Sequence, residues 1–573
     1  MIRSQIATSR TEVVSERGVV ACGHIQEAEA GVRMLEEGGN AVDAVVAAGF
    51  TGHVVEPANC GLGGYGHMAL FLAETRQLVS VDHSVRAPAA ARPDMFEVDP
   101  SGPTTYYGWP PTVDRQDEWG ASSIAVPGAV SGLCAAHERW GRLPLGQVLE
   151  PAIEAAEAGV CITWDLALAI VGRLKEIESL PGAAALLLPR GRPPKIPEDG
   201  GLPDGSVERI DTSRLATTLR EIGRNGAAGF YRGWVAESIE GEVKAGAGFL
   251  TADDLAAYQP KITVEAGAWY RGIRYSTASD PVGYEALNIL GCFDLAAYGS
   301  ESSEYRHLMA EAMGHAFVDN MRHYSDPDFG PSPVTGLASA EFAASRAASI
   351  RLDRAAPRPI LPGDPWPYQR EVPVSPAVAT RPSASGLSGT TQMVAADVGG
   401  NVVALITSVT SAFGSLVFVP TGGFFLNNAM RNFDPRPDRA NSIAPGKMPI
   451  FAVPAIAAER DGVAVFGAGG SGGYRIASGV LHALVNHVDF SMGVQQAVDS
   501  PRVHCQGEET YVDSRIPEAV QGRLRELGHI VVQQSETPAP TNFARVSAVA
   551  RDPATGELSA GSSPPWNTAA AGV

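Results

Sequence analysis

The first eighty residues show two helical patterns followed by two strand patterns. Small and apolar residues recur at helical spacing over 25–50, and the Gly38–Gly39 pair predicts a break between two helices. A glycine-rich turn at 61–66 then leads into two apolar, strand-like runs that end near residue 83. Residues 305–323 again carry apolar side chains at helical spacing, which predicts a helix with a buried stripe.

The middle of the chain holds long stretches that follow neither period. Residues 94–125 are rich in turn formers, and the Pro- and Gly-rich residues 186–207 predict a surface loop. Eight prolines fall within residues 353–389. Because proline blocks both helices and sheet ladders, we expect this segment to be exposed and mobile. It divides the sequence into a first region, 1–389, and a second region, 390–573.

Two strand-like runs at the start of the second region predict a β-hairpin. They flank residues 398–400, and a three-residue loop with glycine at its left-handed position is a common hairpin connection. If the immediate neighbours of this loop close it, Thr390 lies directly opposite Ser408. Opposed residues have Cβ atoms about 4.5–5.5 Å apart. The pattern therefore predicts two neighbouring hydroxyl groups where the second region begins.

Thr390 is either a plain strand residue or a catalytic nucleophile. Cleavage of the Gly389–Thr390 bond would leave Thr390 with a free α-amine, whose ordinary pKa is about 7.7–8.0. Such an amine serves as the general base for the hydroxyl of its own residue. A site of this kind needs neither a histidine nor a metal ion, so no metal and no cofactor are expected.

The glycine-rich turn at 467–473 fits two further catalytic or binding motifs. As G-x-G-x-x-G it matches a dinucleotide-binding fingerprint with Asp489 as its acid, although no second βα unit follows. As G-x-S-x-G it predicts a serine nucleophile at Ser471. The same acid and either His504 or His529 would complete that triad. The simplest alternative is a structural turn without chemistry.

A third chemical interpretation makes the turn part of the threonine site. Backbone N–H groups on a glycine turn at a helix N-terminus can form an oxyanion hole. Gly472 and Gly473 would then stabilise the negative charge that develops when Thr390 attacks an amide carbonyl.

Composition and charge narrow the range of partners. The chain has 573 residues, 45% of them hydrophobic, and a formal net charge of −19. A polyanion repels phosphate backbones and anionic lipids, so we expect neither nucleic acid nor a membrane as a partner. No run of 18 apolar residues and no apolar N-terminal segment occurs. The six cysteines are scattered singly, which favours a reducing cytoplasm over a disulfide framework or a zinc site.

Several motifs together resemble the γ-glutamyltransferase family. TTQMVAAD, AFGS, TGGFFLNNAM and GGSGGYRI follow one another as in that family's small subunit. Upstream, GGNAVDAVVAAGF, VVEPANCGLGGYG, PGAVSGL and MAEAMGHAFVD resemble its large subunit. The resemblance implies an α+β fold, namely the four-layer αββα sandwich of the N-terminal-nucleophile hydrolase type.

The resemblance also implies how the chain is processed and which residues act. It implies a precursor that cuts itself between Gly389 and Thr390, with fragments 1–389 and 390–573 that stay associated, and it leaves a homodimer open. Thr390 matches the nucleophile and Ser408 matches the hydroxyl that supports it. The oxyanion glycines of the family match the pair already singled out in the glycine turn.

The residues that bind the γ-glutamyl group in the family are altered here. The resemblance places Asn432 where the family has an aspartate for the α-amino group, and Thr410 where it has an asparagine. Ile450 and Phe451 stand at the paired serines that bind the α-carboxylate. Two apolar side chains cannot donate those hydrogen bonds, so the γ-glutamyl clamp is lost.

Two further departures lie close to the predicted site. Ser84 stands at the family's carboxylate-binding arginine, with Arg86 two residues on, and Gln392 replaces a histidine that usually follows the two threonines. The substrate-binding candidates are Arg86, Thr410, Asn428, Asn432, Ile450 and Phe451.

These residues predict an autoprocessed N-terminal-threonine amide or acyl hydrolase that acts on a small molecule whose acyl group is not a standard γ-glutamyl. The resemblance includes relatives of that kind, among them cephalosporin acylases and oxamate amidohydrolase. Three alternatives stay open at this stage: a true γ-glutamyltransferase or glutathione hydrolase, an unprocessed and non-catalytic homologue, and a serine hydrolase centred on Ser471.

Overall fold

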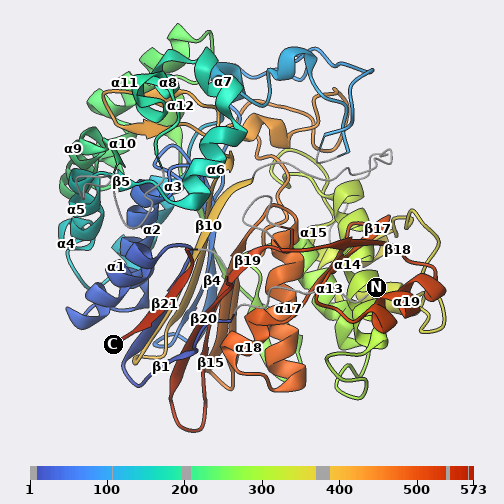
Figure 1. Ribbon diagram of the computed structural model, residues 1–573. Coiled ribbons are helices and arrows are strands. Elements are labelled where there is room, and N and C mark those ends of the chain that lie inside the picture. Colours follow the sequence, from blue (N-terminus) through green and yellow to red (C-terminus); the bar gives the residue numbers. More distant parts are fainter. Residues whose placement is uncertain (1–8, 106–107, 196–207, 370–387, 537–541, 565–566) are drawn as a thin grey trace.

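The computed structural model describes residues 9–105, 108–195, 208–369, 388–536, 542–564 and 567–573. Two seven-stranded antiparallel sheets form its centre and stack face to face (Figure 1). The first has the order β21 (Ala569–Gly572), β2 (Gly18–Cys22), β10 (Ser388–Asp397), β11 (Val402–Ser411), β3 (Tyr65–Leu72), β4 (Gln77–His83) and β7 (Lys261–Glu265). The second has the order β1 (Val13–Ser15), β20 (Leu558–Ser562), β19 (Arg545–Arg551), β15 (Val463–Ser471), β14 (Ile456–Arg460), β9 (Ile273–Ser276) and β8 (Ala268–Tyr270).

Helices cover the outer face of each sheet and complete a four-layer αββα sandwich (Figure 1). The first sheet is covered by α1 (Ile25–Glu36), α2 (Ala41–Val55) and α3 (Ala129–Trp140), with α5 (Glu150–Ala158) packed on α2 and α9 (Ser213–Asn225) packed on α5. The second is covered by α13 (Pro281–Gly291), α14 (Ser303–His323), α17 (Arg475–Phe490) and α18 (Val494–Asp499). The expected α+β sandwich is therefore confirmed.

The other described elements are shorter connections and additions to these layers. They are β5 (Val160–Cys161), β6 (Arg209–Ile210), β12 (Phe418–Val419), β13 (Phe424–Phe425), β16 (Val503–Cys505), β17 (Glu509–Asp513), β18 (Ile530–Gln534), α4 (Leu145–Val148), α6 (Trp164–Gly172), α7 (Leu174–Ser179), α8 (Pro181–Leu187), α10 (Ala228–Tyr231), α11 (Gly233–Ala245), α12 (Ala252–Ala257), α15 (Val334–Leu337), α16 (Ala340–Ala347) and α19 (Glu518–Leu527), with 3₁₀ turns at Val113–Arg115, Ala121–Ser123, Pro189–Gly191, Trp366–Tyr368 and Ala429–Asn432.

Side-chain alternation on β10 explains why its sequence is apolar on both faces. Met393 and Ala395 pack into the core under the outer helices, whereas Val394 and Ala396 pack into the core that includes the second sheet. A strand that is covered on both faces reads as a continuous apolar run. The strand that carries Thr390 is thus a central part of the sandwich, covered on both faces.

The helices and strands predicted near the N-terminus are confirmed. α1 ends before Gly38, which has a φ of 93°, and α2 begins after Asn40, whose side chain caps it. The strand-like runs are β3 and β4. The predicted helix at 305–323 is α14, but its burial is wider than one stripe, because β16 and α19 pack on it as well.

The predicted Pro-rich boundary is only partly a surface segment. Within its described part, 353–369, Ile360 is buried and Arg358 forms an ion pair with Glu311. The expectation of a wholly exposed segment is wrong for these residues, because buried partners hold them. Residues 370–387 lie outside the described part of the chain, as do 196–207 of the predicted surface loop.

Candidate active site

The hairpin places the two predicted hydroxyls together. β10 and β11 pair in the expected register, with Thr390 opposite Ser408, and a bulge lies between Gly389 and Thr390. The Thr390 Oγ1 and Ser408 Oγ atoms are 3.0 Å apart. Both residues are buried.

The Ser408 hydroxyl is oriented by three groups. It donates a hydrogen bond of 2.6 Å to the carbonyl oxygen of Gly389, and it accepts one of 2.9 Å from the backbone N–H of Thr410. Since a hydroxyl has a single proton, Thr390 is the donor in its contact with Ser408. Ser408 therefore polarises the carbonyl group that precedes the nucleophile.

Gly389 is required by close packing, which the sequence did not reveal. An added Cβ atom would lie 2.4 Å from the carbonyl oxygen of Ser411 and 2.7 Å from that of Ala58. Both neighbours are backbone atoms, so neither can move aside as a flexible side chain would. The bond before Thr390 is thus held in a channel that admits only glycine.

The glycine turn lies beside the nucleophile. β15 ends at Ser471, Gly472 and Gly473 follow with φ values of 136° and 63°, and α17 begins at Arg475. Positive φ values favour glycine, since side chains are strained there. The Arg545 side chain joins the turn to the nucleophile strand: its Nε donates to Ser471 Oγ at 2.9 Å and its Nη2 donates to the Thr390 carbonyl at 3.0 Å.

The dinucleotide interpretation of this turn is wrong. β15 pairs antiparallel with β14 and with β19, whereas the fingerprint belongs to a parallel βαβ unit. The sheet order offers no switch point at which the turn could hold a cofactor.

The serine triad does not assemble among the described residues. Asp489 accepts hydrogen bonds from Tyr270 and Arg271, and the Ser471 hydroxyl accepts from Arg545. His504 contacts Ser478 at 2.5 Å, while His529 contacts His307. Each member of the predicted triad is thus engaged by a different partner, which contradicts a serine hydrolase centred on Ser471.

A buried acid pair lies behind the nucleophile and was missed by sequence reasoning. Burial and the neighbouring Glu56 carboxylate raise the pKa of Glu27 well above its usual value. Burial alone would raise the pKa of Glu56 too, but Arg545, a hydrogen bond from Glu27 and His24 hold it below its usual value. Protonated Glu27 therefore donates to ionised Glu56, which lies 3.6 Å from the Arg545 guanidinium.

Several predicted substrate residues gather around the Tyr65 ring. The Tyr65 hydroxyl contacts Thr410 Oγ1 at 3.0 Å and interacts with the Asn432 side chain. The Phe451 ring lies 4.9 Å from the Tyr65 ring, centroid to centroid. Ile450 is buried next to it and donates its N–H to Asn441. The wall beside Ser408 is thus aromatic and apolar.

Two other predicted residues are held by the protein itself. Both polar atoms of the Asn428 side chain are used: Oδ1 accepts from the Ser411 N–H, and Nδ2 donates to the Glu118 carbonyl and to Ser411 Oγ. Buried Gln392 donates to Ser547 on the second sheet. Asn428 therefore has no free polar atom for a substrate, whereas Gln392 Oε1 has no hydrogen-bond partner among the described residues.

Arg86 opens onto a cavity of about 200 Å³. Its guanidinium lies 3.7 Å from Asp82, and although burial would lower the pKa of Arg86, that carboxylate raises it. Ser84 contacts both Asp82 and His67. Phe451 lines the same cavity, which connects the aromatic wall with these charged groups.

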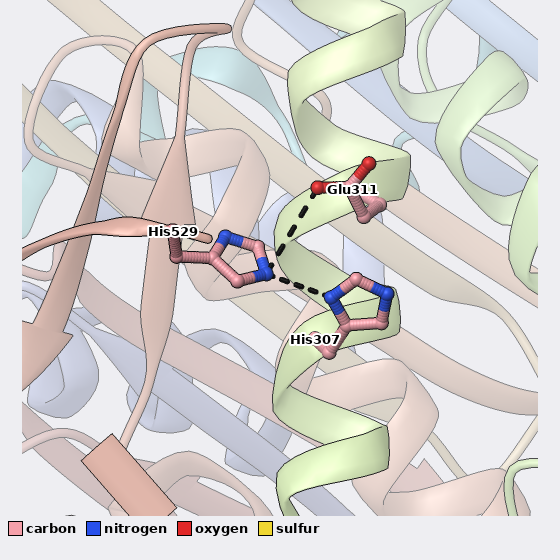
Figure 2. A group of neighbouring side chains, drawn as sticks. All are labelled: His307, Glu311 and His529. Atoms are coloured by element: carbon pink, nitrogen blue, oxygen red, sulfur yellow. Dashed lines mark hydrogen bonds and ion pairs between the residues drawn. The ribbon is translucent and has the colours of Figure 1, made fainter. Parts of the chain in front are cut away.

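One group among the described residues has the composition of a metal site, but its hydrogen bonds fill the ligand positions. His307, Glu311 and His529 come together on α14 and before β18 (Figure 2). Arg358 donates to Glu311 and to His529 Nδ1, so His529 Nε2 carries the proton that it donates to His307 Nδ1 at 2.7 Å. A guanidinium inside the group repels a cation, and we assign it a structural role.

Comparisons with known proteins agree with this geometry. A sequence model described as "Gamma-glutamyltranspeptidase" matches residues 28–573. The chain belongs to this family. An Acylase ACY 1 proenzyme of Pseudomonas sp. (strain SE83) is 34% identical to it over 538 residues, which are 92% of this chain and 89% of that protein. A glutathione hydrolase proenzyme of Bacillus subtilis (strain 168) is 31% identical over 568 residues, with 98% and 92% covered.

A solved structure shares the whole architecture. The crystal structure of a cephalosporin acylase from Bacillus halodurans superposes with a TM-score of 0.84 at 27% identity, covering 100% of this chain and 98% of that chain. Membership of the family and the sandwich fold together make this chain an enzyme of the N-terminal-nucleophile hydrolase type.

In the described part of the chain, no helix is long and apolar enough to cross a membrane.

Proposed function

We propose that the chain cuts itself before Thr390 and then hydrolyses amides whose acyl group is not γ-glutamyl. The contact between Thr390 Oγ1 and Ser408, with Ser408 donating to the Gly389 carbonyl, carries this proposal. It joins a nucleophile, a supporting hydroxyl and a polarised carbonyl at one peptide bond.

The geometry supports a defined route of self-cleavage. Thr390 Oγ1 attacks the Gly389 carbonyl carbon, and the Ser408 hydroxyl stabilises the negative charge that develops on the oxygen. The C–N bond breaks, the proton given up by the Thr390 hydroxyl ends on the Thr390 nitrogen, and an ester remains between Gly389 and the Thr390 side chain. Water then cleaves this ester, which frees the Gly389 carboxylate and restores the threonine hydroxyl.

Turnover uses the amine that cleavage creates. The Thr390 hydroxyl gives its proton to its own α-amine and attacks the substrate carbonyl. N–H groups of Gly472 and Gly473 stabilise the oxyanion, and Ser408 keeps the hydroxyl in place. The protonated amine delivers its proton to the leaving nitrogen. Water then cleaves the acyl-enzyme, with the α-amine of Thr390 again acting as the general base.

The substrate assignment rests on the wall around Tyr65. Ile450 and Phe451 are apolar, and the nearest guanidinium of the predicted set, that of Arg86, lies against Asp82. Apolar side chains at these two positions cannot donate hydrogen bonds to an α-carboxylate, so this part of the wall gives no reason to prefer glutamate. The similarity to an acylase proenzyme and to a cephalosporin acylase supports an acyl group of another kind.

Sheet pairing supports lasting association of the two fragments. β10 pairs with β2, β11 pairs with β3, and β14 pairs with β9, so strands of the second region lie inside sheets shared with the first. Cutting one peptide bond leaves these ladders intact.

We also propose a reducing compartment, since all six cysteines are unpaired. A homodimer stays a prediction.

A panel of anilides tests the substrate assignment. Purified protein should hydrolyse anilides with apolar or other non-glutamyl acyl groups at least tenfold faster than γ-glutamyl anilide, measured as kcat/KM. Thr390→Ala is the inactive control, because it lacks the nucleophile. The alternative of a glutathione hydrolase is favoured by the Bacillus subtilis relative, and a preference for γ-glutamyl anilide would establish it in place of our assignment.

A further inference from the structure

Arg545 connects three separate parts of the fold to the strand of Thr390. Beyond its bonds to Ser471 and to the Thr390 carbonyl, its Nη1 lies 3.6 Å from Glu56 and 3.7 Å from Asp165. The residue is 5% exposed. One guanidinium thus joins the nucleophile strand, the glycine turn, the end of α2 and the start of α6.

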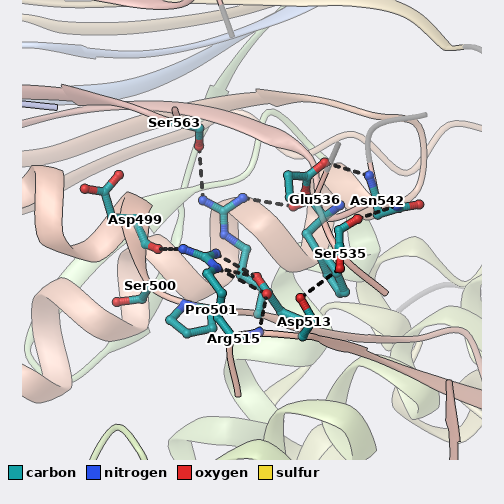
Figure 3. Close-up of polar contacts among 12 residues, drawn as sticks. Asp499, Ser500, Pro501, Asp513, Arg515, Ser535, Glu536, Asn542 and Ser563 are labelled. Atoms are coloured by element: carbon teal, nitrogen blue, oxygen red, sulfur yellow. Dashed lines mark hydrogen bonds and ion pairs between the residues drawn. The ribbon is translucent and has the colours of Figure 1, made fainter. Parts of the chain in front are cut away.

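A second buried network fixes the backbone that carries Arg545. Arg502 donates to the carbonyl groups of Phe543 and Ala544 at 2.9 and 2.8 Å, and Glu536 accepts the N–H groups of Asn542 and Phe543. Figure 3 shows the contact between Glu536 and Asn542, with the Arg515–Asp513 pair beside it. Charged side chains therefore bind both the backbone N–H groups and the backbone carbonyl groups of the segment just before β19.

This network supports a strained backbone at Ala544. Its φ is 66°, a left-handed value that is strained for a residue with a side chain. Ala544 packs against Gly472, whose added Cβ would lie 3.0 Å from the Ala544 Cα. The strained residue directly precedes Arg545 and so directs its side chain towards Thr390.

We propose that Arg545 is the positioning residue of the nucleophile: its guanidinium locks the Thr390 carbonyl to the glycine turn and places a positive charge beside the α-amine that cleavage creates. The proposal rests on the proposed function, because it needs a cleaved chain. It explains why an arginine, with donors on three nitrogens, is buried at this junction.

The positive charge has a consequence for the base. A cation near an amine disfavours the protonated form, so Arg545 keeps the Thr390 amine free at lower pH. A bare charge at about 6 Å and an effective dielectric constant of about 20 shifts such a group by roughly two pH units. The ionised Glu56 carboxylate beside Arg545 opposes this effect, so the expected shift is smaller, on the order of one pH unit. Charged or titratable groups around the site are His24, Glu27, Glu56, Tyr65, Asp165, Arg431 and Arg545.

Three variants test the proposal through the pH dependence of kcat/KM. Arg545→Met removes the charge, so the acidic limb should move up by about one pH unit and kcat should fall about tenfold or more. Arg545→Lys keeps the positive charge but loses the forked donors of the guanidinium. We therefore expect kcat to fall while the acidic limb of the pH profile stays in place. Arg551→Met is the matched control on the same strand: the Arg551 guanidinium donates to the carbonyl groups of Asp397 and Val398 at the hairpin loop, so both values should stay at wild-type level.

The outcomes separate this proposal from the proposed function. If the wild-type chain stays uncut or inactive, the proposed function fails before Arg545 is tested. If Arg545→Met is not cleaved, the kcat of Arg545→Lys tests the positioning role. A kcat of Arg545→Lys equal to that of the wild type overturns that role. If Arg545→Met is cleaved, an unmoved acidic limb overturns the role of the charge.

Discussion

Ser408→Ala removes the donor that polarises the bond to be cut. The hydroxyl lies 2.6 Å from the Gly389 carbonyl oxygen, a short hydrogen bond of the kind that strengthens as negative charge develops. Removal of one oxyanion donor slows comparable reactions by about 10²–10³-fold, or about 2.7–4 kcal/mol in the barrier. We therefore expect self-cleavage of Ser408→Ala to slow by that factor, measured as the decay of full-length chain on denaturing gels.

Ser415→Ala is a closely matched control. Like Ser408, Ser415 is buried, donates to a backbone carbonyl, that of Leu426 at 2.8 Å, and accepts the N–H of the residue two positions on. Each substitution should cost about 1–3 kcal/mol of stability, because a buried N–H and a buried carbonyl lose a partner. Equal cleavage rates in the two variants would refute the role of Ser408, whereas Ser408→Thr should restore cleavage.

Three further predictions follow from individual contacts. Gly389→Ala should give a chain that is cleaved far more slowly or not at all, because its Cβ meets two backbone oxygens within 2.7 Å; gels against wild type decide this. Phe451→Ala should lower kcat/KM for the preferred anilide at least tenfold and should raise the relative kcat/KM for bulkier acyl groups, since it widens the wall beside Tyr65; unchanged selectivity would contradict the pocket. Burial raises the pKa of Asp280 to about 7, so the folded state binds its proton more tightly and its contribution to stability is lost as pH rises from about 4 to about 7. Asp280→Asn keeps the cap on Gly283 and should gain stability relative to wild type at pH 8 but not at pH 4 in urea unfolding; an equal difference at both pH values would contradict this.

The hairpin could be predicted because its information is local. A glycine loop and two β-branched runs fix the register of neighbouring strands, and the structure pairs Thr390 with Ser408 as expected. The layered fold followed from motifs spread over the chain. The rejected interpretations of the turn at 467–473 also had local motifs, but they required parallel strands or a converging triad, which only the tertiary structure can supply.

The network behind the nucleophile could not be predicted from sequence. Arg545 and Thr390 are 155 positions apart and meet only because β19 and β15 pair in the opposite sheet. Glu27 has the spacing of an ordinary polar position on a helix, and nothing in its neighbours indicates burial. Glu56 carried a weak signal, since it directly follows a helix made mostly of small and apolar residues.

The structure distinguishes between predicted substrate residues that look alike in the sequence. Asn428 and Phe451 both stand in apolar, motif-like segments, and the sequence treats them alike. In the structure, the Asn428 amide is consumed by the backbone of the scaffold, while Phe451 faces Tyr65 and the cavity near Arg86. Hydrogen-bond saturation is a property of the folded chain, so it distinguishes these residues only once the contacts are known.

Intact mass spectrometry of active protein under denaturing conditions tests the central claim most directly. We predict two polypeptides with the masses of residues 1–389 and 390–573, the second beginning at Thr390, and a single chain for Thr390→Ala. Full activity in a preparation that contains only the uncut chain would contradict the account, because the amine that acts as the base would then not exist.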